Sequence, residues 1–549
     1  MTGRAAAAGS GVEAAGAAEG AGVEAAEPVG VAEAAGGREA AGAGAARRLV
    51  DTRTLVFLAT IAGIAVAAAI LRFAEIATNP GGLYGDEAAE GLDALLILHQ
   101  PGFHPDWLVW FQDDGGREAL FAYVVAAAFT LFGDSALILR ETAAAIGVAG
   151  VLAIAALAGR WGKVPALVAA AWAAGSLWLI CVSRDGMRNT IVPFFGAIAL
   201  IAILHWAAHP GRGTAVLAGA VTSLSTLYTY QPLKLLPLLV VVWLIWLRHA
   251  DRPRYLQLRA DIPAAIAAFV VVGFPMLAVA VTEPASYFGR ATAVSVFNPA
   301  VVSDVPYPIH VLRTVLMFGF FGDGNGRHDV ASLPLLPIPL ALVGLLGLRR
   351  LWRRRSDPAD SLILLSLGIF MLPPLLFPDG YSPHFLRALG LAAPLGVTIG
   401  LGTAELVDLA RRHWPGRSLA PGLAATLVAV TLAGVAVWSG YVYLNRSIAD
   451  RWEPFSYPAS ALADAAREQP NTAVILGGFD VVDIQFLDYH AMPAIIEPDT
   501  VISNPQAYSR ILAPTRPDLY RSLSAELAAK AIPVAFDPSG QPVVWAVTP

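Results

Sequence analysis

Apolar stretches of membrane-spanning length recur along most of this 549-residue chain, and they constrain its fold more than any other feature. An α-helix rises ~1.5 Å per residue, so about 20 apolar residues cross the ~30 Å hydrocarbon core of a bilayer. The chain is 56% hydrophobic and only 14% charged, with a mean hydropathy of +0.59. This composition is far from the soluble average and predicts an all-α polytopic membrane protein.

About eleven of these stretches are predicted to cross the membrane. They lie near 55–71, 137–159, 164–182, 190–207, 214–230, 233–247, 262–281, 333–348, 361–377, 388–407 and 419–444. A further stretch, 119–132, would form only ~21 Å of helix, which is short for a crossing. We therefore predict that it is a juxtamembrane or re-entrant helix.

The distribution of Arg and Lys fixes the predicted orientation. The connections rich in these residues all fall on one side if the eleven stretches alternate and 119–132 does not cross. Positively charged loops belong in the cytoplasm. The prediction is a multi-pass protein of the plasma (inner) membrane with a cytoplasmic N-terminus and an extracytoplasmic C-terminus.

Composition also divides the chain into three parts. Residues 1–53 begin with a long run of Ala, Gly and Glu that has no hydrophobic core, and we predict a disordered cytoplasmic tail. Residues 54–445 are the predicted transmembrane domain. In 446–549 an amphipathic stretch, Pro458 to Glu468, precedes short apolar runs such as Val543 to Val547, which predicts a small α/β domain.

Charge and cysteine content exclude several classes of function. The net charge is −5, so nothing indicates a nucleic-acid partner. Cys181 is the only cysteine, which excludes a disulfide framework and a metal site built on cysteines.

An acidic pair, Asp86 and Glu87, follows the first apolar stretch directly. Carboxylates near a membrane are costly and are often functional. Two adjacent carboxylates repel each other, which raises one pKa and suits a general base that takes a proton from a nucleophile. The alternative is an ordinary acidic loop.

Several basic residues lie on the same predicted outer side. Arg184 and Arg188 share the short turn Ser183 to Asn189, where they could bind an anionic headgroup in bidentate fashion or extend toward the interface as long charged side chains do. Arg140 is a further candidate, although an ion pair with Glu141 would also explain it. Lys234 could equally be an interface anchor.

Two outer loops add polar candidates. The loop Phe318 to Asp329 contains Asp323, Asn325, Arg327 and His328. Its oxygen and imidazole ligands could hold a divalent cation, and a structured turn with a local Arg–Asp pair is the alternative. Farther along, His384 and Arg387 would share one helix face, where they could bind phosphate or cap the helix.

The order of these motifs resembles the GT-C superfamily of membrane glycosyltransferases, in particular protein O-mannosyltransferases and lipid A aminoarabinose transferases. The matching segments are Tyr84 to Glu87, Arg117 to Gly133, Ile138 to Arg140 and Ser183 to Arg188. The resemblance is good over 55–250 and loose over 250–445, and it has no motif beyond 446. One departure is Asp114 to Glu118, where the family usually has a His-Pro-Pro-Leu type of sequence.

The resemblance implies a GT-C-like helical bundle with outer-face juxtamembrane helices, and a transferase that uses a polyprenyl-phosphate-linked sugar. Asp86, supported by Glu87, would deprotonate an acceptor hydroxyl, and the sugar carbon would be inverted. Arg184, Arg188 and also Arg140 or Lys234 would stabilise the leaving lipid phosphate. The acceptor would be a lipid, a glycan or a protein, and we predict no metal cofactor.

Two alternatives from other classes remain open. A transporter or flippase of a lipid-linked substrate would be expected to show internal repeats and charges near mid-membrane, whereas the polar residues here collect at one face. A non-catalytic membrane scaffold would tolerate the loss of Asp86.

Overall fold

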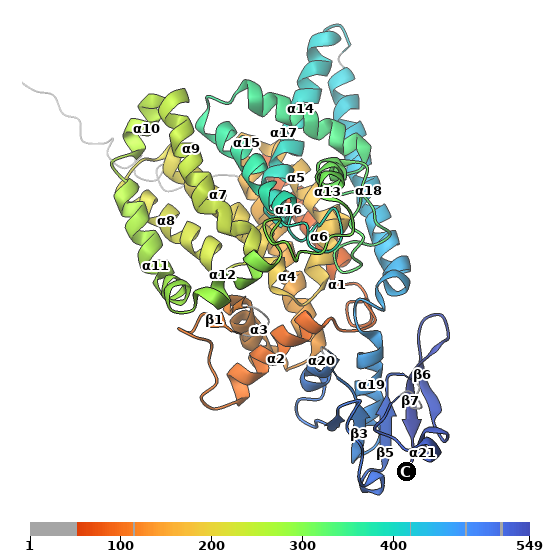
Figure 1. The fold of residues 1–549 in the computed structure, drawn as a ribbon. Coiled ribbons are helices and arrows are strands. Elements are labelled where there is room, and N and C mark those ends of the chain that lie inside the picture. The colour runs from red at the N-terminus through yellow and green to blue at the C-terminus, as the bar shows by residue number, and fades with distance from the viewer. Residues whose placement is uncertain (1–51, 113–115, 418, 478–479, 516–519) are drawn as a thin grey trace, which may run out of the picture. The chain divides into compact units, whose positions relative to one another are not determined.

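The computed structural model describes residues 52–112, 116–417, 419–477, 480–515 and 520–549 (Figure 1). Of the tail predicted over 1–53, residues 1–51 lie outside these residues, and 52–53 belong to the first helix. Residues 57–549 form one compact unit, which is mostly helical. The long and medium helices are α1 (Thr52–Phe73), α2 (Gly85–His99), α3 (Leu120–Phe132), α4 (Ala136–Ala158), α5 (Lys163–Gly175), α6 (Leu177–Arg184), α7 (Val192–Ala208), α8 (Arg212–Leu227), α9 (Leu236–Ala250), α11 (Ile262–Thr282), α14 (Ile338–Arg353), α15 (Pro358–Phe370), α17 (Ala392–His413) and α18 (Ala420–Arg451).

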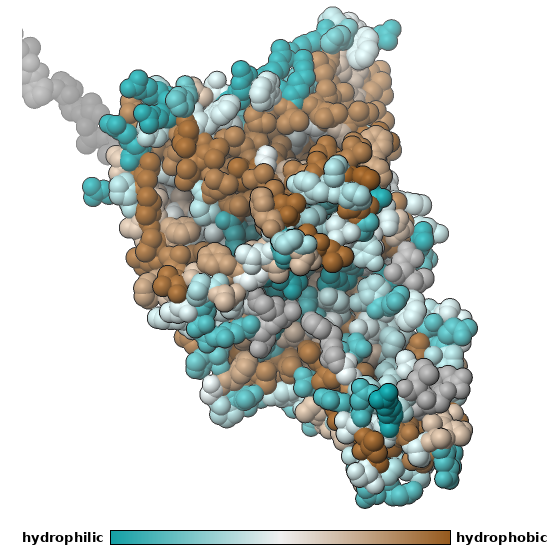
Figure 2. All heavy atoms as spheres, viewed as in Figure 1, coloured by the Kyte–Doolittle hydropathy of each residue, from teal (hydrophilic) through white to brown (hydrophobic). Residues whose placement is uncertain are grey.

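The prediction of a polytopic helical membrane protein is confirmed. Within the described residues, eight helices are long and apolar enough to cross a membrane. The pair α5 and α6, bent by 58° at Ser176, makes a ninth if it is one span. Hydrophobic side chains cover the helical region on the face shown in Figure 2, and hydrophilic ones gather at its ends.

The count of eleven crossings stays a prediction. Every one of the eleven apolar stretches contains a helix, but α8 and α14 have only 16 residues each, or about 24 Å of helix. The helix predicted over 333–348 begins at Ile338 instead, after Pro337. Pro339 lies in the first turn of this helix, where a proline is tolerated because the N–H group it lacks would have no helical partner. The short stretch at 119–132 forms α3, which is too short for a candidate span.

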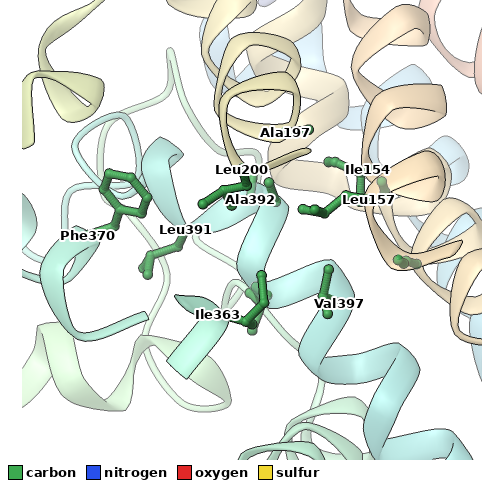
Figure 3. Packing of buried hydrophobic residues seen from close by; sticks show 14 of the residues in the cluster. Ile154, Leu157, Ala197, Leu200, Ile363, Phe370, Leu391, Ala392 and Val397 are labelled. Atoms are coloured by element: carbon green, nitrogen blue, oxygen red, sulfur yellow. The ribbon is translucent and has the colours of Figure 1, made fainter. Parts of the chain in front are cut away.

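The core of the helical region is built from small, branched and aromatic apolar side chains. Figure 3 shows side chains of α4, α7, α15 and α17 packed against one another, including Ile154, Leu200, Ile363 and Val397. All four of these side chains are fully buried. Close packing of this kind fixes the ends of the helices, where the polar residues lie.

Short elements complete the end of the bundle that carries α2. Strands β1 (Trp110–Phe111) and β2 (Arg117–Glu118) pair antiparallel, with Trp110 opposite Glu118. Between α11 and α14 lie α12 (Pro284–Ala293), α13 (Tyr307–Val315) and a loop that extends to Pro337. The 3-10 turns η3 (Arg188–Ile191) and η4 (Gln231–Leu235) begin the apolar segments that continue as α7 and α9.

The C-terminal residues form the predicted small α/β fold. A five-stranded sheet has the order β4-β3-β5-β7-β6, in which β4, β3 and β5 are parallel and β7 and β6 are antiparallel. Its strands are β3 (Thr472–Ile475), β4 (Ala494–Ile496), β5 (Arg510–Ala513), β6 (Ile532–Phe536) and β7 (Pro542–Val547), and its helices are α19 (Tyr457–Arg467), α20 (Asp480–Leu487) and α21 (Ala525–Ala528). The strand β5 and the helix α20 were not predicted.

The last long helix, α18, is followed by a turn and by α19, which lead into this sheet. α18 ends at Arg451, whose guanidinium is fully buried and lies 2.9 Å from Oδ1 of Asp185. The same guanidinium donates to the carbonyls of Gly326 and Arg327 and to the Tyr443 hydroxyl. Arg451, at the end of α18, therefore contacts both the turn after α6 and the polar loop after α13 and holds them next to each other.

Helix α20 packs on α2 through its own apolar side chains. The ring of Phe486 lies where a side chain on Gly91 would stand, because a Cβ built there would be 2.4 Å from the ring. Phe486 also stacks on Phe129 of α3, with 6.3 Å between ring centroids. The C-terminal region thus contacts the helix that carries the acidic pair.

Asp483 of α20 gives this contact a pH dependence. Its side chain is fully buried, and neither carboxylate oxygen has a hydrogen-bond partner among the described residues. Burial, reinforced by Asp480 and Glu87, raises the pKa of Asp483 to about 9. The folded protein therefore binds a proton that the unfolded chain, with a pKa of ~3.9, releases. The free energy of unfolding is therefore expected to fall as the pH rises from about 4 to about 9, by ~1.4 kcal/mol for each pH unit.

Asp483→Asn is expected to remove this fall, because an amide does not ionise. Melting temperatures measured between pH 5 and pH 9 should decline less steeply in the variant than in the wild type. Asp464→Asn is the matched control, since the Asp464 side chain is 76% exposed in α19. If the melting temperatures of the wild type and Asp483→Asn change with pH in the same way, ionisation of this carboxyl does not affect the stability of the protein.

Candidate active site

The acidic pair lies in the first turn of α2. The helix begins at Gly85, and the backbone N–H of Tyr84 donates to Oε2 of Glu87 at 3.4 Å. Negative side chains are favoured in the first turn because the N–H groups there have no helical partner and the helix dipole is positive. Asp86 and Glu87 therefore stabilise the start of this helix, but they point into different surroundings.

Glu87 is fully buried and surrounded by donors. Its Oε1 accepts from Nε of Arg140 at 2.6 Å and from the backbone N–H of Gly186 at 3.0 Å. Its Oε2 accepts from Nη2 of Arg140 at 3.0 Å. Arg140, which is 4% exposed, also donates to the carbonyls of Pro80 and Gly82. The ion pair joins α2 to α4, and its hydrogen-bonding groups have their partners within the protein.

The guanidinium of Arg184 also bonds to other groups of the protein. It is fully buried and donates to the carbonyls of Leu71 and Arg72 near the end of α1, and to that of Asn79. Its guanidinium lies over the Tyr443 ring at 4.4 Å from the centroid. The structure thus places Arg184 as a cap on α1, where the last carbonyls lack helical partners.

Arg188 and Lys234 form a second cluster with two carboxylates. Nη1 of Arg188 lies 2.6 Å from Oε1 of Glu90, and its Nε lies 3.7 Å from Oε2 of Glu118. Nζ of Lys234 lies 2.9 Å from Oε1 of Glu118. The cations keep 15% and 18% of their side chains exposed, whereas both carboxylates are almost fully buried. These two side chains are thus less deeply buried than those of Arg140 and Arg184, although Nε of Arg188 and Nζ of Lys234 are themselves buried.

Asp86 is the accessible member of the acidic pair. Its side chain is 21% exposed, and Oδ2 lies 3.7 Å from Nη1 of Arg327. The Arg327 guanidinium also lies over the Tyr84 ring, 4.2 Å from its centroid. The charge of Asp86 also acts on Arg188. Asp86 is thus in contact with the loop that carries Arg327 and within electrostatic range of the cluster around Arg188.

The loop residues Asp323 and His328 pack against His384. Oδ2 of Asp323 lies 3.0 Å from Nδ1 of His328 and accepts from the backbone N–H of Phe385 at 2.7 Å. The two imidazole rings lie 4.9 Å apart. Burial lowers the pKa of both histidines, and the charge of Arg387 lowers that of His384 further, so both rings are neutral near pH 7.

These three residues are also a candidate metal group, because one ligand atom of each lies within 4.8 Å of the others. Neutral imidazoles and a carboxylate suit a divalent cation. However, Asp323 already accepts three hydrogen bonds, since its Oδ1 also accepts from the N–H of Asn325. A second group, His99, Asp134 and His490, is exposed. The absence of a metal cofactor stays a prediction.

The remaining candidates serve the loops themselves. Arg387 donates to the carbonyls of Phe377 and Asp379 and lies 3.5 Å from the Asp379 carboxylate. Oδ1 of Asn325 accepts from the backbone N–H and from Nε of Arg327. These contacts fix the loop shapes and hold Arg327 toward Asp86.

Sequence reasoning did not single out Glu90 and Glu118. Glu90 stands four residues after Asp86, so the two share one face of a helix, and this spacing could have indicated it. Glu118 belongs to the departure from the family motif, and its approach to Lys234 brings together positions that are far apart along the chain.

No family model matches this chain, and no curated protein sequence matches it. Among solved structures it is similar to ArnT from Cupriavidus metallidurans, over 90% of this chain and 98% of that one. The TM-score is 0.53 with 16% identity for ArnT bound to undecaprenyl phosphate, and 0.55 with 15% identity for the apo state. The oligosaccharyltransferase of Archaeoglobus fulgidus is less similar, with a TM-score of 0.47, 13% identity, and 80% and 64% of the two chains covered.

The similarity to ArnT reaches beyond the segment in which the sequence resembled a known family. A match over 90% of the chain is longer than 55–445 alone can supply, so it includes the C-terminal region as well. At this identity the likeness concerns the fold. The chain has the fold of the GT-C superfamily of membrane glycosyltransferases.

Proposed function

We propose that this protein transfers a sugar from a polyprenyl-phosphate-linked donor to an acceptor hydroxyl at the outer face of the plasma (inner) membrane, with inversion at the sugar carbon. The observation that carries the proposal is the position of Asp86. Its partly exposed carboxylate lies 3.7 Å from Nη1 of Arg327, and its charge acts on the partly exposed cation Arg188. The fold shared with ArnT, one structure of which is bound to undecaprenyl phosphate, supports this choice of donor.

The proposed reaction needs one base and one set of cations. Asp86 takes the proton of the acceptor hydroxyl as the oxygen attacks the sugar carbon from the side opposite the phosphate. The bond between that carbon and the phosphate oxygen breaks, and polyprenyl phosphate leaves with its negative charge. Arg188 and Lys234 stabilise this charge, because fixed cations in a partly dry site interact strongly with a developing anion. We propose no metal for this step.

The same geometry separates positioning residues from residues that contact substrate. Glu87, Arg140 and Arg184 are buried and bonded within the protein. We therefore assign to them the task of holding the first turn of α2 and the end of α1. His384 and Arg387 belong to a neighbouring loop, and we propose them as further contacts for the donor phosphate.

Donor binding tests the cationic part of the proposal. Arg188→Lys keeps the charge beside Glu90 but removes the planar bidentate donor, so affinity for polyprenyl phosphate is expected to fall roughly ten- to a hundredfold. The measurement is equilibrium binding of polyprenyl phosphate to the purified full chain in nanodiscs. Arg313→Lys is the matched control, because Arg313 is paired with Asp304 away from this cluster. Equal affinities for both variants would contradict the assignment.

The same preparation distinguishes a transferase from a flippase. With a panel of polyprenyl-phosphate sugars and hydroxylated acceptors, a transferase releases free polyprenyl phosphate in proportion to the glycosylated product. A flippase would move the intact donor across the bilayer and release neither product. The panel also resolves whether the sugar is a hexose or a pentose.

A further inference from the structure

A polar cavity of about 770 Å³ lies beside Asp86, between the loop after α13 and the residues that follow α18. Its wall includes Arg327 and Asp329 from the loop, Tyr381, and Trp452 and Glu453 from the C-terminal region. We call it the loop pocket. Its volume is in the range of small-molecule binding sites.

The loop pocket is connected to the candidate base by direct contacts. Arg327 lines the pocket and lies 3.7 Å from the Asp86 carboxylate. Tyr84, two residues before Asp86, also lines it, and its ring carries the Arg327 guanidinium. A ligand in the loop pocket would therefore lie close to Asp86.

The lining has the chemistry of a site for sugar rings. Tyr84, Tyr381 and Trp452 supply aromatic surfaces with polar edges, on which the C–H faces of a sugar can pack. The exposed carboxylate of Glu453 can accept hydrogen bonds from hydroxyl groups. Charges of both signs are present, so the lining does not select a strongly charged ligand.

The same lining does not suit a lipid chain. Among the described residues, no Leu, Ile, Val, Phe or Met lines the loop pocket. The cavity between α7, α8, α9 and α11 is the opposite case. It measures about 220 Å³, and its walls are almost wholly apolar side chains such as Ile203 and Phe269. A hydrophilic ligand is thus favoured in the loop pocket.

From these observations we infer that the loop pocket binds a polyhydroxylated glycan as the acceptor, and that Trp452 and Glu453 of the C-terminal region take part in choosing it. This inference rests on the proposed function and names the acceptor class for the same site. The donor sugar is the other hydrophilic ligand at hand, but it is attached to a lipid phosphate that the cluster of Arg188 and Lys234 is proposed to hold.

An array of lipid-free oligosaccharides, probed with the purified full chain, tests the inference. The wild type is expected to bind a subset of the glycans, and Tyr381→Ala to weaken that binding roughly two- to tenfold, because one aromatic face is lost. Tyr441→Ala is the matched control, since Tyr381 and Tyr441 are 50% and 57% exposed. Trp452→Phe should keep most of the affinity, and Glu453→Gln, a change at an exposed residue, should alter which glycans bind.

The arms of the experiment separate this inference from the proposed function. Asp86→Asn should still bind the glycans, because binding needs no base, while transfer is lost. Sugar transfer to a lipid acceptor, without binding of any lipid-free glycan, would overturn the inference and leave the proposed function standing. A rise in the KM for the donor in Tyr381→Ala, with an unchanged KM for the acceptor, would assign the loop pocket to the donor sugar and overturn it as well.

Discussion

Asp86→Asn is expected to lower the rate of sugar transfer by roughly 10²- to 10⁴-fold, the range over which a positioned general base accelerates a reaction. The substitution removes the basic oxygen and keeps the size of the side chain. The first turn of α2 should persist, because Glu87 remains bonded to Arg140 and to Gly186. The measurement is kcat for the purified variant, together with its binding of polyprenyl phosphate.

Arg327→Gln is the informative comparison. It removes the ion pair at 3.7 Å but leaves the Asp86 carboxylate in place, so its loss of kcat should be much smaller than that of Asp86→Asn. Donor binding should be nearly unchanged in Asp86→Asn. Transfer at the wild-type rate by a folded Asp86→Asn protein would sink the assignment of the base.

Arg140→Met is expected to lower the free energy of unfolding by about 3–5 kcal/mol, the cost of leaving one partner of a buried ion pair without the other. Glu87 would remain buried with a negative charge, and the carbonyls of Pro80 and Gly82 would lose their donor. Thermal unfolding in detergent should show a melting temperature lower by several degrees.

A double-mutant cycle separates the ion pair from other effects. Adding Glu87→Gln to Arg140→Met removes the uncompensated charge, so the double variant should be more stable than Arg140→Met alone. Arg411→Met is the control, because Arg411 and Asp408 form an exposed pair near the end of α17 whose loss should change stability by less than ~0.5 kcal/mol. If Arg140→Met melts like the wild type, the role of Arg140 lies elsewhere than in the fold.

Much of the helical architecture could be predicted because apolar length is a local property of the sequence. The C-terminal strand at 542–547 could be predicted for the same reason, because Val543 to Val547 is a short apolar run. The strand β5 begins with Arg510, and α20 has an acidic first turn. Neither segment therefore has the uninterrupted apolar run that predicted the other C-terminal elements.

The candidate site could be predicted only in part. The sequence indicated that Asp86, Arg188 and Lys234 lie at ends of helices, and the structure places them near one another. It could not indicate that Glu87 and Arg140, 53 positions apart, bond to each other, or that Arg184 caps α1. Those contacts depend on how the helices pack, and packing joins residues that no local pattern relates.

The buried contact between Arg451 and Asp185 has a consequence for the C-terminal region. A chain that stopped before Arg451 would remove the partner of the buried Asp185 ion pair and would release the carbonyls of Gly326 and Arg327. The loop that faces Asp86 would lose one of its anchors. The end of α18, which leads into the C-terminal sheet, is therefore a structural part of the proposed catalytic face.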